Sequence, residues 1–129
     1  MTATKLKLSV LQDRFAICAL DKNSPLPDWA ITDGMFSVTR TADELSVVCY
    51  ESRVPEDVKS NTGWRCLKVE GPLDFSLTGI LASLATSLAN AGISIFALST
   101  YETDYLLIKE NNLNAAISAL SEGGYLIAR

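Results

Sequence analysis

The sequence predicts an α+β fold in which a four-stranded antiparallel sheet carries two helices on one face. Two observations predict it. From Trp64 onward, short apolar segments typical of strands and two amphipathic segments follow in the order strand, helix, strand, strand, helix, strand. That order is typical of the ferredoxin-like βαββαβ arrangement. The first half of the chain repeats the order weakly, which predicts a second, degenerate copy.

The first half is predicted to hold short strands joined by loops, because its apolar runs are brief and bounded by turn residues. Pro25 and Pro27 predict a loop over Asp21–Gly34 with one helical turn near Asp28–Ile31. Pro55 in a first-turn position predicts a short helix over Val54–Ser60, and Asn61-Thr62-Gly63 predicts a turn. The expected strands are Leu6–Leu11, Phe15–Leu20, Phe36–Arg40 and Leu45–Tyr50.

The second half begins with a predicted strand, Trp64–Val69, and continues with the clearest helix of the chain, Leu77–Ala91. Ser76 is a suitable N-cap residue, and Gly92 supplies a left-handed residue after the helix end. The apolar residues of this segment fall at helical spacing on one face. They are Leu77, Ile80, Leu81, Leu84, Leu88 and Ala91.

A β-hairpin is predicted over 92–109, because the apolar runs Ile93–Leu98 and Tyr105–Ile108 flank the polar tip Ser99–Asp104. A second helix follows from a cap at Asn112 to Gly123-Gly124, and Tyr125–Ala128 is the expected last strand. A right-handed crossover places Trp64–Val69 parallel to Ile93–Leu98, with Tyr105–Ile108 between them. The loop at 71–76 and the hairpin tip are then expected at the same end of the sheet.

An internal echo predicts a tandem duplication. Thr39–Leu45 matches Ser99–Tyr105 at an offset of 60, and Gly63-Trp64 matches Gly124-Tyr125 at an offset of 61. We therefore expect a degenerate first domain over 1–62 and a complete one over 63–129.

Composition excludes several classes of function. The net charge of −4 is divided evenly between the halves and leaves no basic patch, so a nucleic-acid partner is not expected. The chain has no run of about 18 apolar residues and no secretory signal, so a cytoplasmic protein without a membrane partner is expected. Cys18, Cys49 and Cys66 are expected as buried, reduced thiols in apolar strands. Histidine and C-x-x-C are absent, so neither a metal site nor another cofactor is expected.

The two converging loops suggest a binding site rather than catalysis. Backbone N–H groups at the start of the 77–91 helix would hold a carboxylate, and Asp104 would hold an ammonium group. A free amino acid carries both groups on one carbon. Hydroxyls of Ser76, Thr100 and Thr103 could add hydrogen bonds, and Phe75 or Tyr101 an apolar wall. Asp and Thr are also ordinary turn residues. We expect no catalytic residues, since there is no histidine for general-base work at neutral pH and no nucleotide or nucleophile motif occurs.

Five segments of the second half resemble the ACT domain. They are GWR at 63–65, VEGPLDF at 69–75, TGILA at 78–82, AGISI at 91–95 and STYETDY at 99–105. The chain is similar to the subgroup found in the cytosolic arginine sensors called CASTOR and in small bacterial stand-alone homologues. The resemblance implies the fold above and a ligand that is an amino acid or another small effector, usually bound at an interface between ACT units. It implies ligand contacts at Thr100, Tyr101 and Asp104 in the tip, and at Leu73, Asp74, Phe75 and Ser76 in the preceding loop.

The leading hypothesis is therefore a cytoplasmic, non-catalytic regulatory or sensor protein that binds a small amino-acid-like ligand and acts on a protein target. The alternative is a ligand-free protein–protein interaction module that uses the open face of the sheet. Strand Ile93–Leu98 is apolar on both faces and is expected at the sheet edge. Such an edge favours pairing with another chain, so a homodimer is expected.

Overall fold

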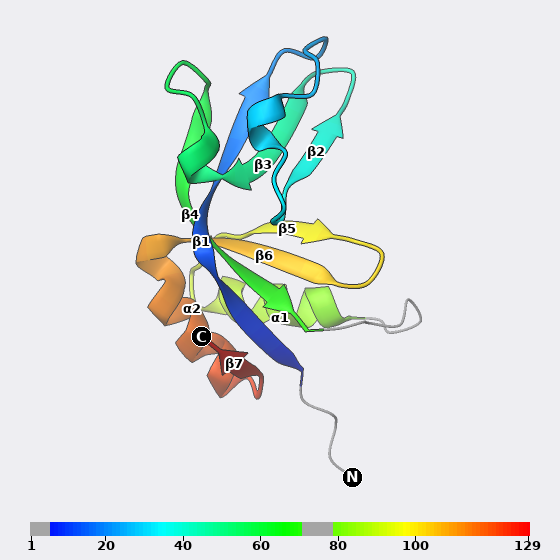
Figure 1. Cartoon of the computed structure of the whole chain (residues 1–129). Coiled ribbons are helices and arrows are strands. Elements are labelled where there is room, and N and C mark those ends of the chain that lie inside the picture. Colours follow the sequence, from blue (N-terminus) through cyan, green and yellow to red (C-terminus); the bar gives the residue numbers. More distant parts are fainter. Residues whose placement is uncertain (1–5, 71–78) are drawn as a thin grey trace. The chain divides into compact units, whose positions relative to one another are not determined.

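The structure, a computed structural model, describes residues 6–70 and 79–129. The chain divides into two compact units (Figure 1): unit 1 comprises Met1–Gln12 and Arg65–Arg129, and unit 2 comprises Asp13–Trp64. The sequence predicted a division after residue 62. The two units instead divide between Trp64 and Arg65, and the chain up to Gln12 groups with the second half. Two long strands, β1 (Lys7–Leu20) and β4 (Ser60–Val69), each contribute residues to both units.

Unit 2 follows the order strand, helical turn, strand, strand, helical turn, strand. Its strands lie in the order β2-β3-β1-β4, and β3 pairs antiparallel with both neighbours. A buried apolar cluster forms its core and includes Cys18, Leu45, Val47 and Cys49. The remaining elements are η1 (Asp28–Ala30), β2 (Ser37–Arg40), β3 (Leu45–Tyr50) and η2 (Glu51–Arg53).

Three boundaries expected in the first half are wrong. Residues 12–14 do not interrupt a strand: their exposed polar side chains lie within the continuous strand β1. The helical turn η2 precedes Pro55, because the residue before a proline is driven to extended backbone and Val54 has φ −76° and ψ 124°. Residues 61–63 belong to β4 rather than to a turn. Gly63 has φ +80°, which a glycine adopts without strain.

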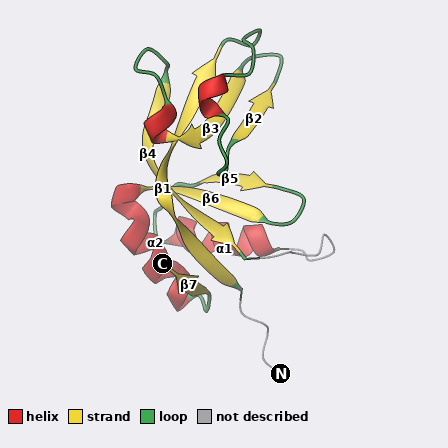
Figure 2. Cartoon of the chain, in the orientation of Figure 1, coloured by secondary structure: helices red, strands yellow, loops and turns green. Residues whose placement is uncertain are grey.

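Unit 1 has the strand order β5-β6-β4-β1-β7, and its sheet carries both helices on one face (Figures 1 and 2). As expected, β6 lies between β4 and β5, and it is antiparallel to β5. The elements are α1 (Ile80–Asn90), β5 (Phe96–Ser99), β6 (Asp104–Lys109), η3 (Glu110–Asn112), α2 (Leu113–Glu122) and β7 (Leu126–Ala128).

The last strand departs from the predicted four-stranded antiparallel sheet. β7 pairs parallel with the start of β1, where Leu8 is opposite Ile127. The N-terminal half of β1 therefore lies between β7 and β4. No pattern in the second half of the chain predicts a strand contributed from the N-terminus.

Both helices end at the glycines where the sequence predicted their ends. Gly92 and Gly124 have φ +75° and +96°. Ile93 N–H donates to Leu88 C=O, and Gly92 N–H to Ala89 C=O, which is the Schellman arrangement. α1 begins later than expected, because Gly79 also has positive φ and a continuous helix cannot pass through it.

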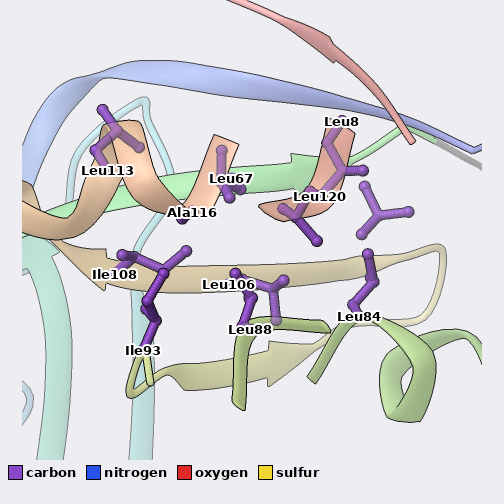
Figure 3. Close-up of a cluster of buried hydrophobic side chains, with 11 residues drawn as sticks. Leu8, Leu67, Leu84, Leu88, Ile93, Leu106, Ile108, Leu113, Ala116 and Leu120 are labelled. Atoms are coloured by element: carbon purple, nitrogen blue, oxygen red, sulfur yellow. The ribbon is translucent and has the colours of Figure 1, made fainter. Parts of the chain in front are cut away.

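The core of unit 1 lies between its sheet and the two helices (Figure 3). It combines Leu84 and Leu88 of α1, residues of α2, and inward-facing residues of the strands. The buried members are Leu8, Leu67, Val69, Leu84, Leu88, Ile93, Leu106, Ile108, Leu113, Ala116 and Leu120.

Candidate functional site

The β5–β6 hairpin ends in a four-residue tip, 100–103, between the paired residues Ser99 and Asp104. Thr100 N–H donates to the Thr103 carbonyl oxygen at 2.8 Å. The Thr100 hydroxyl donates to the same oxygen at 3.2 Å and accepts from Thr103 N–H at 3.3 Å. Threonine closes turns in this way, so the Thr100 side chain fixes the backbone of the tip.

Thr103 joins the tip to the end of β4. Its hydroxyl donates to the Val69 carbonyl oxygen, and its side chain is only 6% exposed. Among the residues that the structure describes, Thr103 is the one polar residue that is buried. From the sequence, Thr103 is expected only as an additional hydrogen-bond donor to a ligand. Its structural role follows from the fold, which brings β4 and the tip together.

Asp104 lies on the helix-covered face of the sheet. Alternate strand residues share a face, and Leu106 and Ile108 of the same strand lie in the core beneath the helices. The Ser99 hydroxyl donates to Oδ1 of Asp104 at 2.5 Å. Asp104 is half-buried, so its carboxylate is oriented by Ser99 and remains partly accessible.

The start of α1 lies at the same end of unit 1 as the tip and the end of β4 (Figure 1). Gly79 occupies its N-cap position and has no side chain with which to bond the first-turn amides. The N–H groups of a helix's first turn have no partner within the helix, and together with the helix dipole they favour an anion. A carboxylate side chain and a helix start therefore face the same end of this unit.

Three of the seven predicted ligand contacts fall within the described residues. Thr100, Tyr101 and Asp104 lie together in the hairpin, where the Thr100 hydroxyl is used by the turn and Tyr101 is 81% exposed. The other four, Leu73, Asp74, Phe75 and Ser76, lie outside the described residues, as does the expected helix start at Leu77.

The three cysteines are free and buried, as expected. Burial raises the pKa of Cys66 to about 12. The Cys18 and Cys49 thiols are hydrogen-bonded to each other, which lowers the pKa of Cys18, against the effect of burial, and raises the pKa of Cys49 well above its ordinary value. Buried thiols are poor nucleophiles. All three cysteines lie among the buried apolar residues, so their role is packing.

β5 lies at an edge of the unit 1 sheet, as expected for this strand. Phe96 and Leu98 pair with Leu107 and Tyr105 on the face away from the helices and are half-buried. Among residues 6–70 and 79–129, no group of three or more metal-ligating side chains is found. Within the same residues, no helix has the length and apolar character needed to span a membrane.

Family models divide the chain much as its two units do. An ACT domain model matches residues 59–122. A second model, described as an N-terminal domain, matches residues 13–57, close to the span of unit 2.

Individual relatives agree with these matches. The crystal structure of protein Atu0741 from Agobacterium tumefaciens is 39% identical, with a TM-score of 0.91 over 97% of this chain and 93% of that chain. The human cytosolic arginine sensor for mTORC1 subunit 1 is 30% identical over 97 residues, 71% of this chain and 28% of the sensor. The chain thus matches little more than a quarter of that relative. The regulatory subunit of aspartate kinase from Thermus thermophilus, 11% identical, shares the fold with a TM-score of 0.63 over 89% of this chain and 95% of that one.

Proposed function

The chain belongs to the ACT domain family, and on that premise we propose that it is a cytoplasmic regulatory protein that binds a free amino acid and catalyses no reaction. The observation that carries the proposal is the position of Asp104, half-buried on the helix-covered face at the end where α1 begins. The name of the human relative, an arginine sensor, supports an amino-acid ligand.

The ligand is proposed to lie with its ammonium group at Asp104 and its carboxylate at the first turn of α1. A charge-assisted bond to the aspartate and backbone N–H donors at a helix start are suited to these two groups. The Ser99 hydroxyl supports this role, because it orients one carboxylate oxygen of Asp104. Leu73, Asp74, Phe75 and Ser76 are proposed as further contacts, and Tyr101 as a cover.

We further propose that the two units are tandem copies and that unit 2 is the degenerate one. Each has the order strand, helical segment, strand, strand, helical segment, strand. Unit 2 has the neighbour order β2-β3-β1-β4, and unit 1 has the corresponding order with β1 inserted. In unit 2, the short 3₁₀ turn η1 stands where unit 1 has α1. The turn η2 corresponds to η3, and no helix like α2 follows it.

A homodimer is proposed for the regulatory form. The edge strand β5, with Phe96 and Leu98 half-buried beside it, supports pairing with a second chain. The same apolar face supports the alternative function, a ligand-free module that contacts a target protein.

A thermal-shift screen against the twenty standard free amino acids tests the proposed function. A ligand that binds only the folded state raises the melting temperature, by an amount equivalent to about 2.7 kcal/mol at a hundredfold excess over Kd. We expect at least one amino acid to raise it in a concentration-dependent way, and the amide of the same amino acid, which lacks the carboxylate, to have a smaller effect. No shift with any amino acid at millimolar concentration would favour the interaction module.

A further inference from the structure

The two hairpins of the chain have the same tip. In unit 2, β2 and β3 pair up to Arg40 and Leu45, leaving residues 41–44 as the loop. In unit 1, β5 and β6 pair up to Ser99 and Asp104, leaving residues 100–103. The tips therefore correspond at an offset of 59, one residue less than the sequence echo predicts, and η2 and η3 follow at the same offset.

A threonine opens both tips and makes the same bonds. Thr41 N–H donates to Glu44 C=O at 2.9 Å. The Thr41 hydroxyl accepts from Glu44 N–H at 3.1 Å and lies 3.4 Å from the Glu44 carbonyl oxygen. Thr100 makes the corresponding bonds to Thr103. The shared threonine is thus what this hairpin needs in order to close.

The residue after the tip differs between the hairpins. Asp104 of unit 1 corresponds to Leu45 of unit 2, which is fully buried in the core of that unit. The next inward-facing positions agree, since Val47 corresponds to Leu106 and both are fully buried. The hairpin therefore accepts an apolar side chain where unit 1 carries a carboxylate.

From this comparison we infer that Thr100 is a positioning residue that holds the tip, that Asp104 is a binding residue that the fold does not require, and that the chain carries one amino-acid site rather than two. This inference rests on the proposed function. It differs from the expectation that the Thr100 hydroxyl binds the ligand, because that hydroxyl bonds within the turn. At the position of Asp104 the unit 2 hairpin carries the buried Leu45, and the two carboxylates of its tip, Asp43 and Glu44, are exposed. We therefore assign the unit 2 tip a role in the fold alone.

The test begins with thermal unfolding of the full chain without ligand. Asp104→Leu introduces the residue that the corresponding position carries, and its melting temperature should equal or exceed that of the wild type. Thr100→Val and Thr41→Val remove a hydroxyl at constant size, and each should lower the melting temperature by about 3–6 °C. Thr100→Ser keeps the hydroxyl and should restore most of the loss. A fall for Asp104→Leu as large as that for Thr100→Val would overturn the assignment.

Native mass spectrometry in a mixture of the twenty amino acids then counts bound molecules per chain. We expect one for the wild type and Thr41→Val, none for Asp104→Leu, and at least tenfold weaker binding for Thr100→Val that Thr100→Ser rescues. Two molecules per chain, or a loss of binding in Thr41→Val, would contradict the single site. Absence of binding in every variant would refute the proposed function, while the unfolding data would still test which residue the fold needs.

Discussion

Asp104 and Glu102 are two carboxylates of one hairpin with different surroundings. Asp104 is half-buried and bonded by Ser99, whereas Glu102 is exposed at the apex of the tip. Asp104→Asn removes the charge at constant shape. It should weaken amino-acid binding by roughly ten- to a hundredfold, since a charge-assisted bond contributes about 1.5–3 kcal/mol.

Glu102→Gln is the matched control, because it removes the same charge from a position exposed to solvent. Calorimetric titration with the amino acid selected by thermal shift should give nearly wild-type affinity for this variant. Equal affinity in the wild type and Asp104→Asn would remove Asp104 from the site.

The raised pKa of the Cys66 thiol makes the free energy of unfolding depend on pH. Its pKa is about 12 in the folded protein because of burial, against about 8.5 for an exposed thiol. The stability that follows from keeping this thiol protonated is fully present below about pH 8.5 and is lost as the pH rises toward 12. Urea unfolding at pH 8 and 10.5 should show the wild type losing about 1–3 kcal/mol more than Cys66→Ala. Parallel losses would show that the thiol titrates normally.

At the scale of single residues, Asp104 stays a predicted ligand contact, chosen because a carboxylate at a hairpin tip is not explained by apolar packing. The hydrogen bonds of Thr103 and Thr100 could not be predicted from the sequence, because a turn threonine looks the same whether its hydroxyl faces a ligand, the turn or a neighbouring strand. That choice depends on the approach of β4, which only the fold determines.

Among the elements, the hydrogen bond between the tip and β4 makes a measurable contribution to the free energy of unfolding. Thr103→Val replaces the buried hydroxyl by a methyl group and leaves the Val69 carbonyl oxygen without this donor. The free energy of unfolding should fall by about 1–3 kcal/mol. Chemical denaturation measures it, and Thr103→Ser, which keeps the hydroxyl, should lose less. A Val variant as stable as the wild type would show that the bond does not hold the tip.

The end of α1 gives a second prediction at this scale. Gly92 has φ +75°, so Gly92→Ala should destabilise the protein by about 1 kcal/mol through backbone strain alone. A Cβ at this position would meet no atom within 4 Å, so no clash adds to that figure. Thermal unfolding checks it, and an unchanged melting temperature would contradict the left-handed end.

Element types in the second half followed from periodicity and end signals, and most boundaries lay within a few residues. The errors have local causes. Proline at position 55 imposes extended backbone on Val54, which ends η2. Glycine at position 79 starts α1 later. Polar residues 12–14 form part of β1 because a strand that continues from one unit into the next tolerates exposed side chains between its buried ends.

For the whole molecule, the order β4-β6-β5 was predictable from chirality, but the insertion of β1 beside β7 was not. A pairing between the two ends of a chain leaves no local pattern in the sequence. The sequence echo placed the two hairpins at an offset of 60, whereas the strand register gives an offset of 59.

Association is the prediction that belongs to the whole molecule. Light scattering coupled to size exclusion at micromolar concentration should give the mass of a dimer. Phe96→Glu should weaken both association and amino-acid binding, because it places a charge beside the exposed edge of β5. Ala97→Glu is the control, because it places the same charge at an exposed position of β5 on the opposite face from Phe96. A weaker effect of Ala97→Glu would show that the Phe96 face matters, and not only a charge on the edge strand. A monomer with and without amino acid would refute the dimer.

We propose above that the hairpin tip and the start of α1 together form one amino-acid site. Backbone amide chemical shifts of the 14.0 kDa chain, recorded while the amino acid from the screen is added, test it most directly. The largest changes are expected at the first turn of α1 and at Ser99–Asp104. The corresponding tip at 41–44 should stay unchanged and serves as an internal control. Equal changes at both tips, or changes confined to other surfaces, would contradict it.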